Sequence, residues 1–276
     1  MIAYIPTRGT ARLRSHLLAD KLGLDFVLVC DTANQKRHIH KDYKVPNSNI
    51  KICAGATGPP TGAAYKRDYI SRKLAAKGKW MLWLDDNLQY LTCLNPKLSS
   101  DKLDFEDKSV NWREEFKNMA TKKQVWKYLN ETMDYADELG TINAGFSGEE
   151  NYFFRANKWA LWTYVRTQFS LYKNDKSLWL PKKFIMLEDM YKSIDVVARY
   201  GHAIVNRHLK PMKTPFEEGG IGSLEYRLPY LRQNCKWFMQ EYPGLLSYLK
   251  GRDYHVTFAK RSQKSITAWR KENGYV

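Results

Sequence analysis

The stretch KWMLWLDDNLQYL, residues 79–91, is an apolar run broken by two carboxylates and an amide before it becomes apolar again. Its first half, WMLWL, has the length and composition of a buried strand. Asp85, Asp86 and Asn87 follow where that strand should end. Such residues commonly form an Asx-turn or a helix cap, but they also offer the hard oxygen ligands that Mg²⁺ and Mn²⁺ prefer. The neighbouring segments favour the second interpretation.

Those neighbouring segments alternate between strand and helix patterns. IAYIP (2–6), DFVLVCD (25–31) and IKICAG (50–55) read as strands, while 11–23 and 63–78 have helical spacing and end in Gly23 and Gly78. The alternation predicts βαβ units and a mostly parallel sheet, hence an α/β fold. Ligands of such sheets bind beyond the carboxyl ends of the strands. We therefore expect three polar clusters to converge on one crevice: Pro6-Thr7-Arg8, Asp31 and Asp85-Asp86-Asn87.

The second half of the chain is predicted to be mainly helical. Residues 121–140 have an N-cap candidate in Thr121, and 187–201 read as a helix that begins at Glu188-Asp189. Residues 151–165 are expected to pass from strand to helix, 202–209 to form a strand, and 225–251 to be helical with interruptions at Pro229 and Pro243. No linker clearly divides the chain. We expect a catalytic domain over 1–210 and a helical, basic extension over 211–276 packed on it.

The net charge of +16 is unevenly distributed along the chain. Residues 1–80 carry 15 Lys and Arg against 5 Asp and Glu, residues 81–180 carry 13 against 15, and residues 181–276 carry 17 against 9. Two basic ends suggest a polyanionic partner, most simply nucleic acid. The alternative is a surface made basic for solubility.

Cysteine use and hydropathy bear on the compartment. The four cysteines form no CxxC pair, which favours reduced, buried thiols over zinc sites or disulfides. No apolar run approaches the roughly 18 residues of a membrane span, and the first residues carry no export signal pattern. These features predict a cytoplasmic protein with no membrane partner.

Two further groups of residues are candidates for chemistry. Lys66 and Arg67 would lie in the first turns of a helix that follows a glycine-rich loop, where phosphate binds readily. Glu188 and Asp189 open a later helix, although acids in a first turn are also ordinary partners of the helix dipole. His202 and His208 flank a predicted strand, and spacing does not choose between them as a metal ligand or a phosphate contact.

Taken in order, these residues resemble a GT-A fold glycosyltransferase, with a Rossmann-like sheet. The chain is most similar to the TET-associated glycosyltransferases of bacteriophages, and the likeness rests on YIPTRG, TGAAYKRDYI, WMLWLDDN and MLEDMY within residues 1–210. The resemblance implies a D-x-D-like metal motif at Asp85-Asp86-Asn87. The chain departs from the family motif at its third position, where Asn87 is a neutral ligand. Asp86 could take over the metal-binding role of that position.

The resemblance also implies roles for the other residues. Asp31 would contact the nucleoside, and Pro6, Thr7 and Arg8 the base and ribose. Lys66, Arg67 and Asp86 would complete the donor site, His208, or else His202, would lie near the metal and the diphosphate, and Asp189 or Glu188 would be the catalytic base. The implied reaction moves a sugar, glucose being the expected one, from a UDP-sugar to the hydroxyl of a hydroxymethylpyrimidine base in DNA, with Mn²⁺ or Mg²⁺.

The basic C-terminal stretch is a candidate for the DNA contact. Residues 254–275 mix aromatic side chains with Lys260, Arg261, Lys264 and Arg270, which suit phosphate or the donor diphosphate. A solvated basic tail is the alternative. Three rival functions also stay open: a glycosyltransferase for glycans or lipid carriers, a nucleotidyltransferase of similar fold, and a DNA-binding protein without catalysis.

Overall fold

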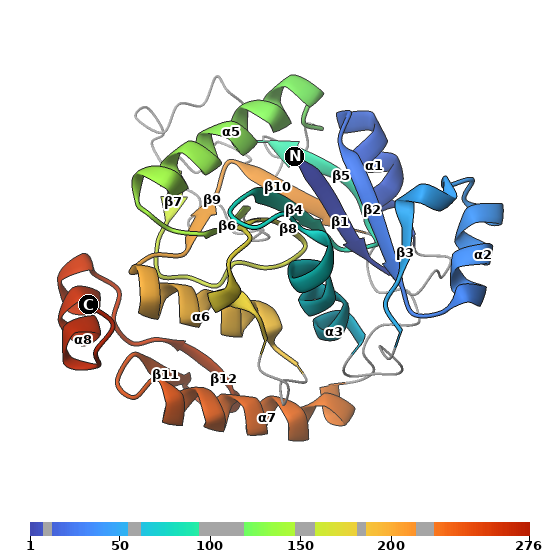
Figure 1. The fold of residues 1–276 in the computed structure, drawn as a ribbon. Helices are drawn as coiled ribbons and strands as arrows, with labels where there is room; N and C mark the ends of the chain where they lie inside the picture. The colour runs from blue at the N-terminus through green and yellow to red at the C-terminus, as the bar shows by residue number, and fades with distance from the viewer. Residues whose placement is uncertain (8–12, 55–61, 94–118, 147–157, 181–185, 214–223) are drawn as a thin grey trace, which may run out of the picture.

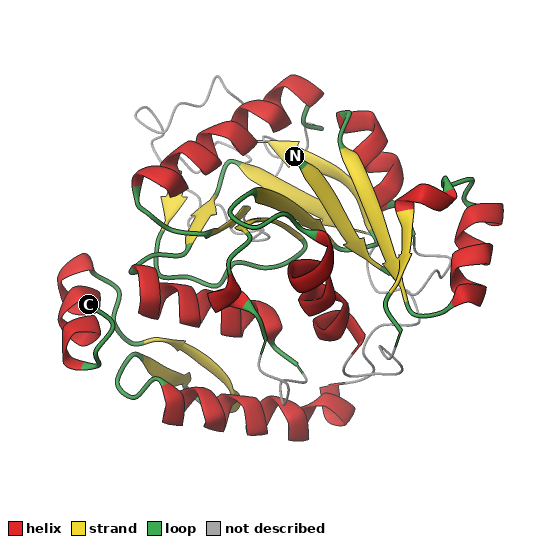
Figure 2. Cartoon of the chain, viewed as in Figure 1, coloured by secondary structure: helices red, strands yellow, loops and turns green. Residues whose placement is uncertain are grey.

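The computed structural model describes residues 1–7, 13–54, 62–93, 119–146, 158–180, 186–213 and 224–276. Figure 2 shows a sheet with helices on both sides. Within the described residues, the main sheet has eight strands in the order β3-β2-β1-β4-β8-β6-β9-β7. Their bounds are Ile50–Ile52, Asp25–Cys30, Ile2–Pro6, Trp80–Leu84, Phe169–Lys173, Asn143–Phe146, Ile204–Asn206 and Trp159–Ala160.

The sheet is mixed but mostly parallel. β3, β2, β1 and β4 pair in parallel, β8 runs antiparallel to β4 and β6, β6 pairs in parallel with β9, and β7 runs antiparallel to β9. The predicted α/β class is confirmed, and the strands predicted at 2–6, 25–31 and 80–86 are found at Ile2–Pro6, Asp25–Cys30 and Trp80–Leu84. The carboxyl ends of β1, β2 and β4 therefore lie at the same edge of the sheet.

The helices form layers on the two faces of this sheet (Figure 1). Side chains alternate along β4, so Leu82 and Leu84 pack in one core cluster with α1 and α5, while Met81 and Trp83 face the layer of α3 and α6. The helices are α1 (Ser15–Leu22), α2 (Ala33–Asp42), α3 (Gly62–Tyr69, continued by a π-helical turn over Ile70–Leu74), α5 (Lys122–Glu138) and α6 (Glu188–Tyr200).

Two helix signals from the sequence are confirmed at their ends. Thr121 caps α5 in a capping box with Gln124, and α6 begins at Glu188 and ends before Gly201, whose φ is +89°. Short 3₁₀ turns cover Asn47–Asn49 and Lys176–Leu178, and β5 (Leu88–Cys93) pairs with β10 (Leu209–Lys213) in a separate two-stranded sheet.

The C-terminal segment differs from the helical extension that we predicted. α7 (Leu224–Glu241) runs through Pro229, but Leu246–Leu249 form strand β11, which pairs with β12 (Arg252–Phe258) before α8 (Gln263–Glu272). Pro243 and Gly244, whose φ is +74°, end the helix because neither continues helical geometry well. The extension is a helix, a hairpin and a helix.

This segment packs on the main domain through α6. One core cluster joins Ile194 and Val197 of α6 with Phe238 of α7, Val256 of β12 and Trp269 of α8. β10 spans the expected boundary at residue 210.

A second local prediction was wrong, because residues 161–168 form no helix after β7. Within the described part of the chain, no helix combines the length and the hydropathy needed to cross a membrane.

Candidate functional site

The N-terminus of α1 holds the turn after β4 in place. The amides of Arg14 and Ser15 donate to the carbonyl of Asp86 at 2.8 and 3.3 Å, and the Ser15 hydroxyl donates to the carbonyl of Asp85. The amide of Leu88 in turn donates to the Ser15 Oγ at 2.9 Å. Main-chain bonds therefore fix this turn, and the carboxylates of Asp85 and Asp86 are directed to other elements.

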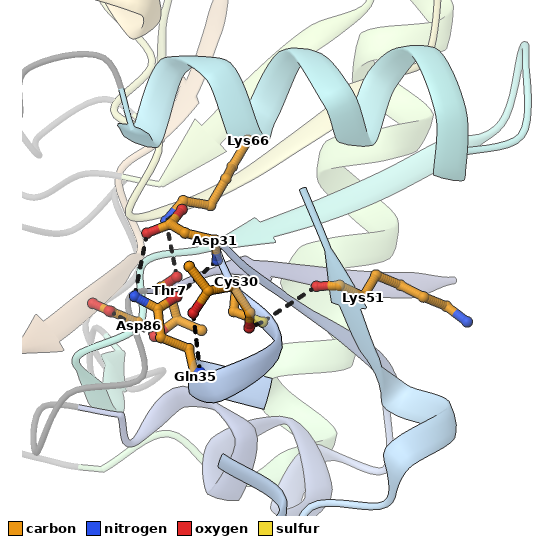
Figure 3. A network of polar contacts seen from close by, with 8 residues as sticks. Thr7, Cys30, Asp31, Gln35, Lys51, Lys66 and Asp86 are labelled. Atoms are coloured by element: carbon orange, nitrogen blue, oxygen red, sulfur yellow. Dashed lines mark hydrogen bonds and ion pairs between the residues drawn. The ribbon is translucent and has the colours of Figure 1, made fainter. Parts of the chain in front are cut away.

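One set of contacts joins the ends of β1, β2 and β4 to α3 (Figure 3). Lys66 Nζ lies 2.6 Å from Asp31 Oδ1 and donates to the carbonyl of Thr7 at 2.9 Å. The Thr7 hydroxyl donates to Asp86 Oδ2 at 3.1 Å. Lys66 is only 2% exposed. A buried ammonium needs such partners, and its two strand-end contacts fix the distance between α3 and the sheet.

Gln35 of α2 completes this set around Asp31. The amide of Asp31 donates to Gln35 Oε1 at 2.7 Å, and Gln35 Nε2 lies 3.5 Å from Asp31 Oδ2. Pro6 is the last residue of β1 and pairs with Val29 of β2. Arg8, the third residue of the predicted Pro-Thr-Arg loop, lies outside the described residues.

A second set of contacts centres on Arg67. Its guanidinium donates to Asp85 Oδ1 at 2.7 Å and to Glu188 Oε1. It also lies 5.7 Å from the ring centroid of Trp83. Arg67 is buried while the Asp85 side chain remains 25% exposed. Arg67 thus ties the end of β4 to the beginning of α6, and Asp85 still reaches solvent.

The entrance of α6 places Asp189 next to this ion-pair network. Leu187, the residue before the helix, has φ +59° and ψ 34°, a left-handed conformation that is uncommon outside glycine. Asp189 Oδ1 accepts from the amide of Met190 at 2.8 Å. Loss of hydration raises the pKa of Asp189; the charge of Arg67 opposes that rise and the charge of Asp85 adds to it. Asp189 is therefore suited to accept a proton.

Among the described residues of the site, carboxylates outnumber cations. Lys66 pairs with Asp31, Arg67 pairs with Asp85 and Glu188, and Asp86 accepts from the Thr7 hydroxyl. Among the described residues, no group of three or more His, Cys, Asp or Glu side chains is arranged to hold a metal. Divalent ions on phosphate ligands often take one or two carboxylates from the protein. Asp85 and Asp86 are the pair that fits that requirement.

The other predicted metal ligands are placed less favourably. Asn87 is 6% exposed. In the ribbon of β5 and β10, Lys213 pairs with Leu88 while Leu209 pairs with Cys93, so His208 lies beyond the far end, more than about 20 Å of strand from Asn87. Its ring packs edge-on against Tyr128 at 6.0 Å. The structure does not bring His208 to the aspartates, because β10 reaches the Asn87 end of β5 only at Lys213, five residues after His208.

His202 is also away from the aspartates, at the opposite end of α6 from Glu188. Its Nε2 lies 2.5 Å from Gln263 Oε1 at the start of α8, and burial lowers its pKa. Its contacts are those of a structural residue between α6 and α8.

The four predicted nucleic-acid contacts divide into two pairs. Arg270 donates to the carbonyls of Ala198 and Arg199 at 3.0 and 2.5 Å, so it satisfies the C-terminal end of α6. Arg261 donates to Phe258 O at 2.9 Å and Thr257 Oγ1 at 2.7 Å. Lys264 is exposed and Lys260 is partly exposed. The arginines are engaged by the fold, and the lysines face solvent.

Two residues near the site were missed in the sequence. Gln35 follows Asp31 by four residues, a spacing that brings two side chains together when a helix begins between them. Thr32, the N-cap of α2, was the residue in the sequence that could have indicated this helix. Lys192 lies one turn after Asp189 on α6 and is fully buried. Its helical spacing from Glu188 and Asp189 was visible, but its burial was not.

Comparisons with known proteins add little to this geometry. No protein-family model matches the chain, and no curated protein matches it. Among solved structures the chain is similar to the crystal structure of A197 from STIV, with 12% identity and a TM-score of 0.31 over 78% of this chain and 85% of that one. A likeness at that TM-score supports no argument, so the candidate function depends on the chain's own residues.

Proposed function

We propose that the chain is a metal-dependent glycosyltransferase of the GT-A type. It transfers a sugar, glucose in the first instance, from a UDP-sugar to the hydroxyl of a hydroxymethylpyrimidine base in DNA. The observation that carries the proposal is the meeting of Thr7, Asp31, Asp85 and Asp86 at one edge of the sheet. Ligands of open α/β sheets bind beyond this edge.

The excess of carboxylates supports a cation and a diphosphate as ligands. Asp85 and Asp86 would hold Mg²⁺ or Mn²⁺, which when bound neutralises charge on a leaving diphosphate. Arg67 pairs with Asp85 at 2.7 Å, and Lys66 pairs with Asp31 at the neighbouring strand end. Arg67 in particular has a forked guanidinium suited to phosphate oxygens. Asp31 and Thr7 are left to contact the nucleoside.

Asp189 is the better of the two candidate bases. Glu188 is bound to Arg67, whereas the pKa of Asp189 is raised by burial. Asp189 takes the proton of the acceptor hydroxyl while the hydroxyl oxygen bonds to the anomeric carbon. The bond from that carbon to the diphosphate oxygen breaks, and UDP leaves with the electron pair. A positioned base of this kind contributes roughly 10²–10⁴-fold to the rate.

The charge of the chain supports DNA as the acceptor. Residues 1–80 and 181–276 are both strongly basic, and duplex DNA attracts such surfaces with salt-sensitive affinity. A glycan or lipid acceptor would not require a net charge of +16. This charge, rather than the donor site, separates the proposal from the other glycosyltransferases.

The test is incubation of the chain with Mn²⁺, a panel of nucleotide sugars and DNA that contains hydroxymethylcytosine or hydroxymethyluracil. Mass spectrometry of the digested nucleosides should show the gain of one hexose on the modified base. Unmodified DNA of the same sequence is the matched control. Transfer of the sugar to a glycan, with UDP released and no mass gain on DNA, would contradict the acceptor, and pyrophosphate release from a nucleoside triphosphate would contradict the reaction class.

A further inference from the structure

Lys192 is a buried lysine beneath the candidate site. It follows Glu188 and Asp189 by four and three residues on α6, which places the three side chains on one side of the helix. Its side chain is 0% exposed. The amine lies 3.7 Å from the ring centroid of Trp83 and 5.1 Å from that of Tyr172. No hydrogen-bond partner for the amine exists among the described residues.

The sheet face opposite Lys192 carries further unsatisfied polar atoms. Trp83 of β4 pairs with Ser170 of β8, and both are fully buried. Within the described structure, the indole N–H of Trp83 and the hydroxyl of Ser170 also lack hydrogen-bond partners. Such atoms are few in native proteins. The Lys192 amine, the Trp83 indole N–H and the Ser170 hydroxyl therefore form a group of buried polar atoms in a place where apolar side chains would be more stable.

The charged groups around Lys192 do not form an ion pair with it. From α3, Arg67 shares the Trp83 ring with Lys192, and Asp68 is bound to Arg72 and to the amide of Leu180. From α6 itself, Glu188 is held by Arg67, and Asp189, three residues before Lys192, accepts from the amide of Met190. Burial and the charge of Arg67 hold the pKa of Lys192 well below its usual range, and Asp68 opposes them weakly. Tyr172 on β8 offers only its ring.

We infer that the Lys192 amine is neutral in the free chain and becomes protonated when a nucleoside diphosphate binds at the candidate site, beside Arg67 and Asp85. The inference takes its ligand class from the proposed function. Arg67 already pairs with Asp85 and Glu188, and an incoming diphosphate adds further negative charge beside it, which makes a second cation nearby more favourable. The amine then takes a proton from solvent, and the faces of Trp83 and Tyr172 stabilise the ammonium. Lys192 is a positioning residue, because it acts on the ligand through Arg67.

Calorimetric titration of the chain with UDP and Mn²⁺ at pH 7.5, in two buffers of different ionisation enthalpy, measures proton uptake. The wild-type chain should take up a proton on binding, and Lys192→Met should take up less and bind about tenfold more weakly, a change of about 1.4 kcal/mol. Lys123→Met, which removes an exposed lysine of α5, is the matched control and should behave as wild type. Equal uptake in wild type and Lys192→Met would overturn the inference.

A second measurement needs no ligand and separates this inference from the proposed function. A lysine that is neutral when folded but protonated when unfolded costs stability below its unfolded pKa of about 10.4. Lys192→Met should therefore be more stable than wild type, by an amount that grows as the pH falls from 10 to 6. A less stable Lys192→Met at every pH would identify a structural cation and overturn the inference, even if UDP binds. The expected stability pattern without UDP binding would overturn the ligand class and the proposed function together.

Discussion

Two regions of this chain are rich in charged residues, and the fold treats them differently. At the ends of β1, β2 and β4, Lys66 pairs with Asp31 and Arg67 pairs with Asp85 and Glu188, which come from distant segments of the chain. In the C-terminal region, Arg261 and Arg270 instead bind carbonyls close to α8 and at the end of α6. Charge alone therefore does not identify a binding site. Convergence from several elements is the better indication.

The difference has a physical origin. A parallel sheet brings the ends of its strands to one edge whatever residues stand there, so polar residues at strand ends are placed by topology. A long arginine on a surface helix finds the nearest unsatisfied carbonyl, and helix C-termini supply these. The first kind of placement follows from the order of strands, and the second depends on local packing.

The largest expected effect tests whether Asp189 takes a proton during catalysis or only contributes charge to the acidic site. Asp189→Asn keeps the shape of the side chain but removes its ability to take a proton. Sugar transfer to DNA should fall by roughly 10²–10⁴-fold, while UDP binding should stay close to the wild-type value. Single-turnover rates and calorimetric affinities measure the two effects. Transfer at the wild-type rate would assign the base to Glu188 or to another residue.

The same variant has a predicted effect on stability. Because the pKa of Asp189 is raised in the folded chain, ionisation of this carboxyl opposes folding as the pH rises above the unfolded value of about 3.9. Asp189→Asn should therefore gain stability over wild type between pH 4 and 7, with no gain at pH 3. Urea denaturation at several pH values would measure it, and a gain that did not vary with pH would contradict the assigned cause.

The next effect tests whether the acidic site is also structural. Arg67→Met leaves Asp85 and Glu188 without their partner, and breaking a buried ion pair on one side costs about 3–5 kcal/mol. Arg72→Met, on the same helical segment, removes a partly exposed pair with Asp68, a hydrogen bond to the Leu180 carbonyl and a contact with the Trp179 ring, and should cost about 1–2 kcal/mol. The free energies of unfolding from denaturant curves measure both. Equal losses would show that Arg67 is not a special link between β4 and α6.

The smallest effects concern the basic C-terminal region. Arg270→Met should reduce stability by about 1 kcal/mol, since two carbonyls lose a donor. Lys264→Met should leave stability unchanged and lower the slope of DNA affinity against salt by about 1 if this lysine contacts phosphate. Fluorescence anisotropy across a salt series measures that slope. If Arg270→Met instead lowered the salt slope and Lys264→Met reduced stability, Arg270 would be the DNA contact, and the assignment of the arginines to the fold and the lysines to DNA would be wrong.

Much of the fold was predictable from local patterns. Apolar runs bounded by polar residues located β1, β2 and β4, and Thr121 marked the start of α5. α2 was missed because only Ile39 of its ten residues is buried, which leaves little apolar periodicity to detect. β11 was mistaken for helix because Leu245, Leu246 and Leu249 also suit helical spacing. A hairpin and a short amphipathic helix are hard to separate over so few residues.

The candidate site was predictable in part. Asp31 and Asp85 follow predicted strands, so their convergence at one edge of the sheet followed from the expected topology, whereas Glu188 was linked to this site only by the family resemblance. The position of His208 did not, because the register of β10 on β5 is a long-range pairing that no local pattern fixes. The burial of Lys192 depends on how α6 lies across the sheet, which the sequence does not specify.

The most direct test of the central claim is a crystal structure of the chain with UDP and Mn²⁺, with anomalous diffraction used to locate the manganese. We predict one manganese bound by Asp85 and Asp86, with the diphosphate beside Arg67 and the nucleoside at Thr7 and Asp31. A manganese position away from both aspartates, or a diphosphate bound elsewhere on the chain, would contradict the account.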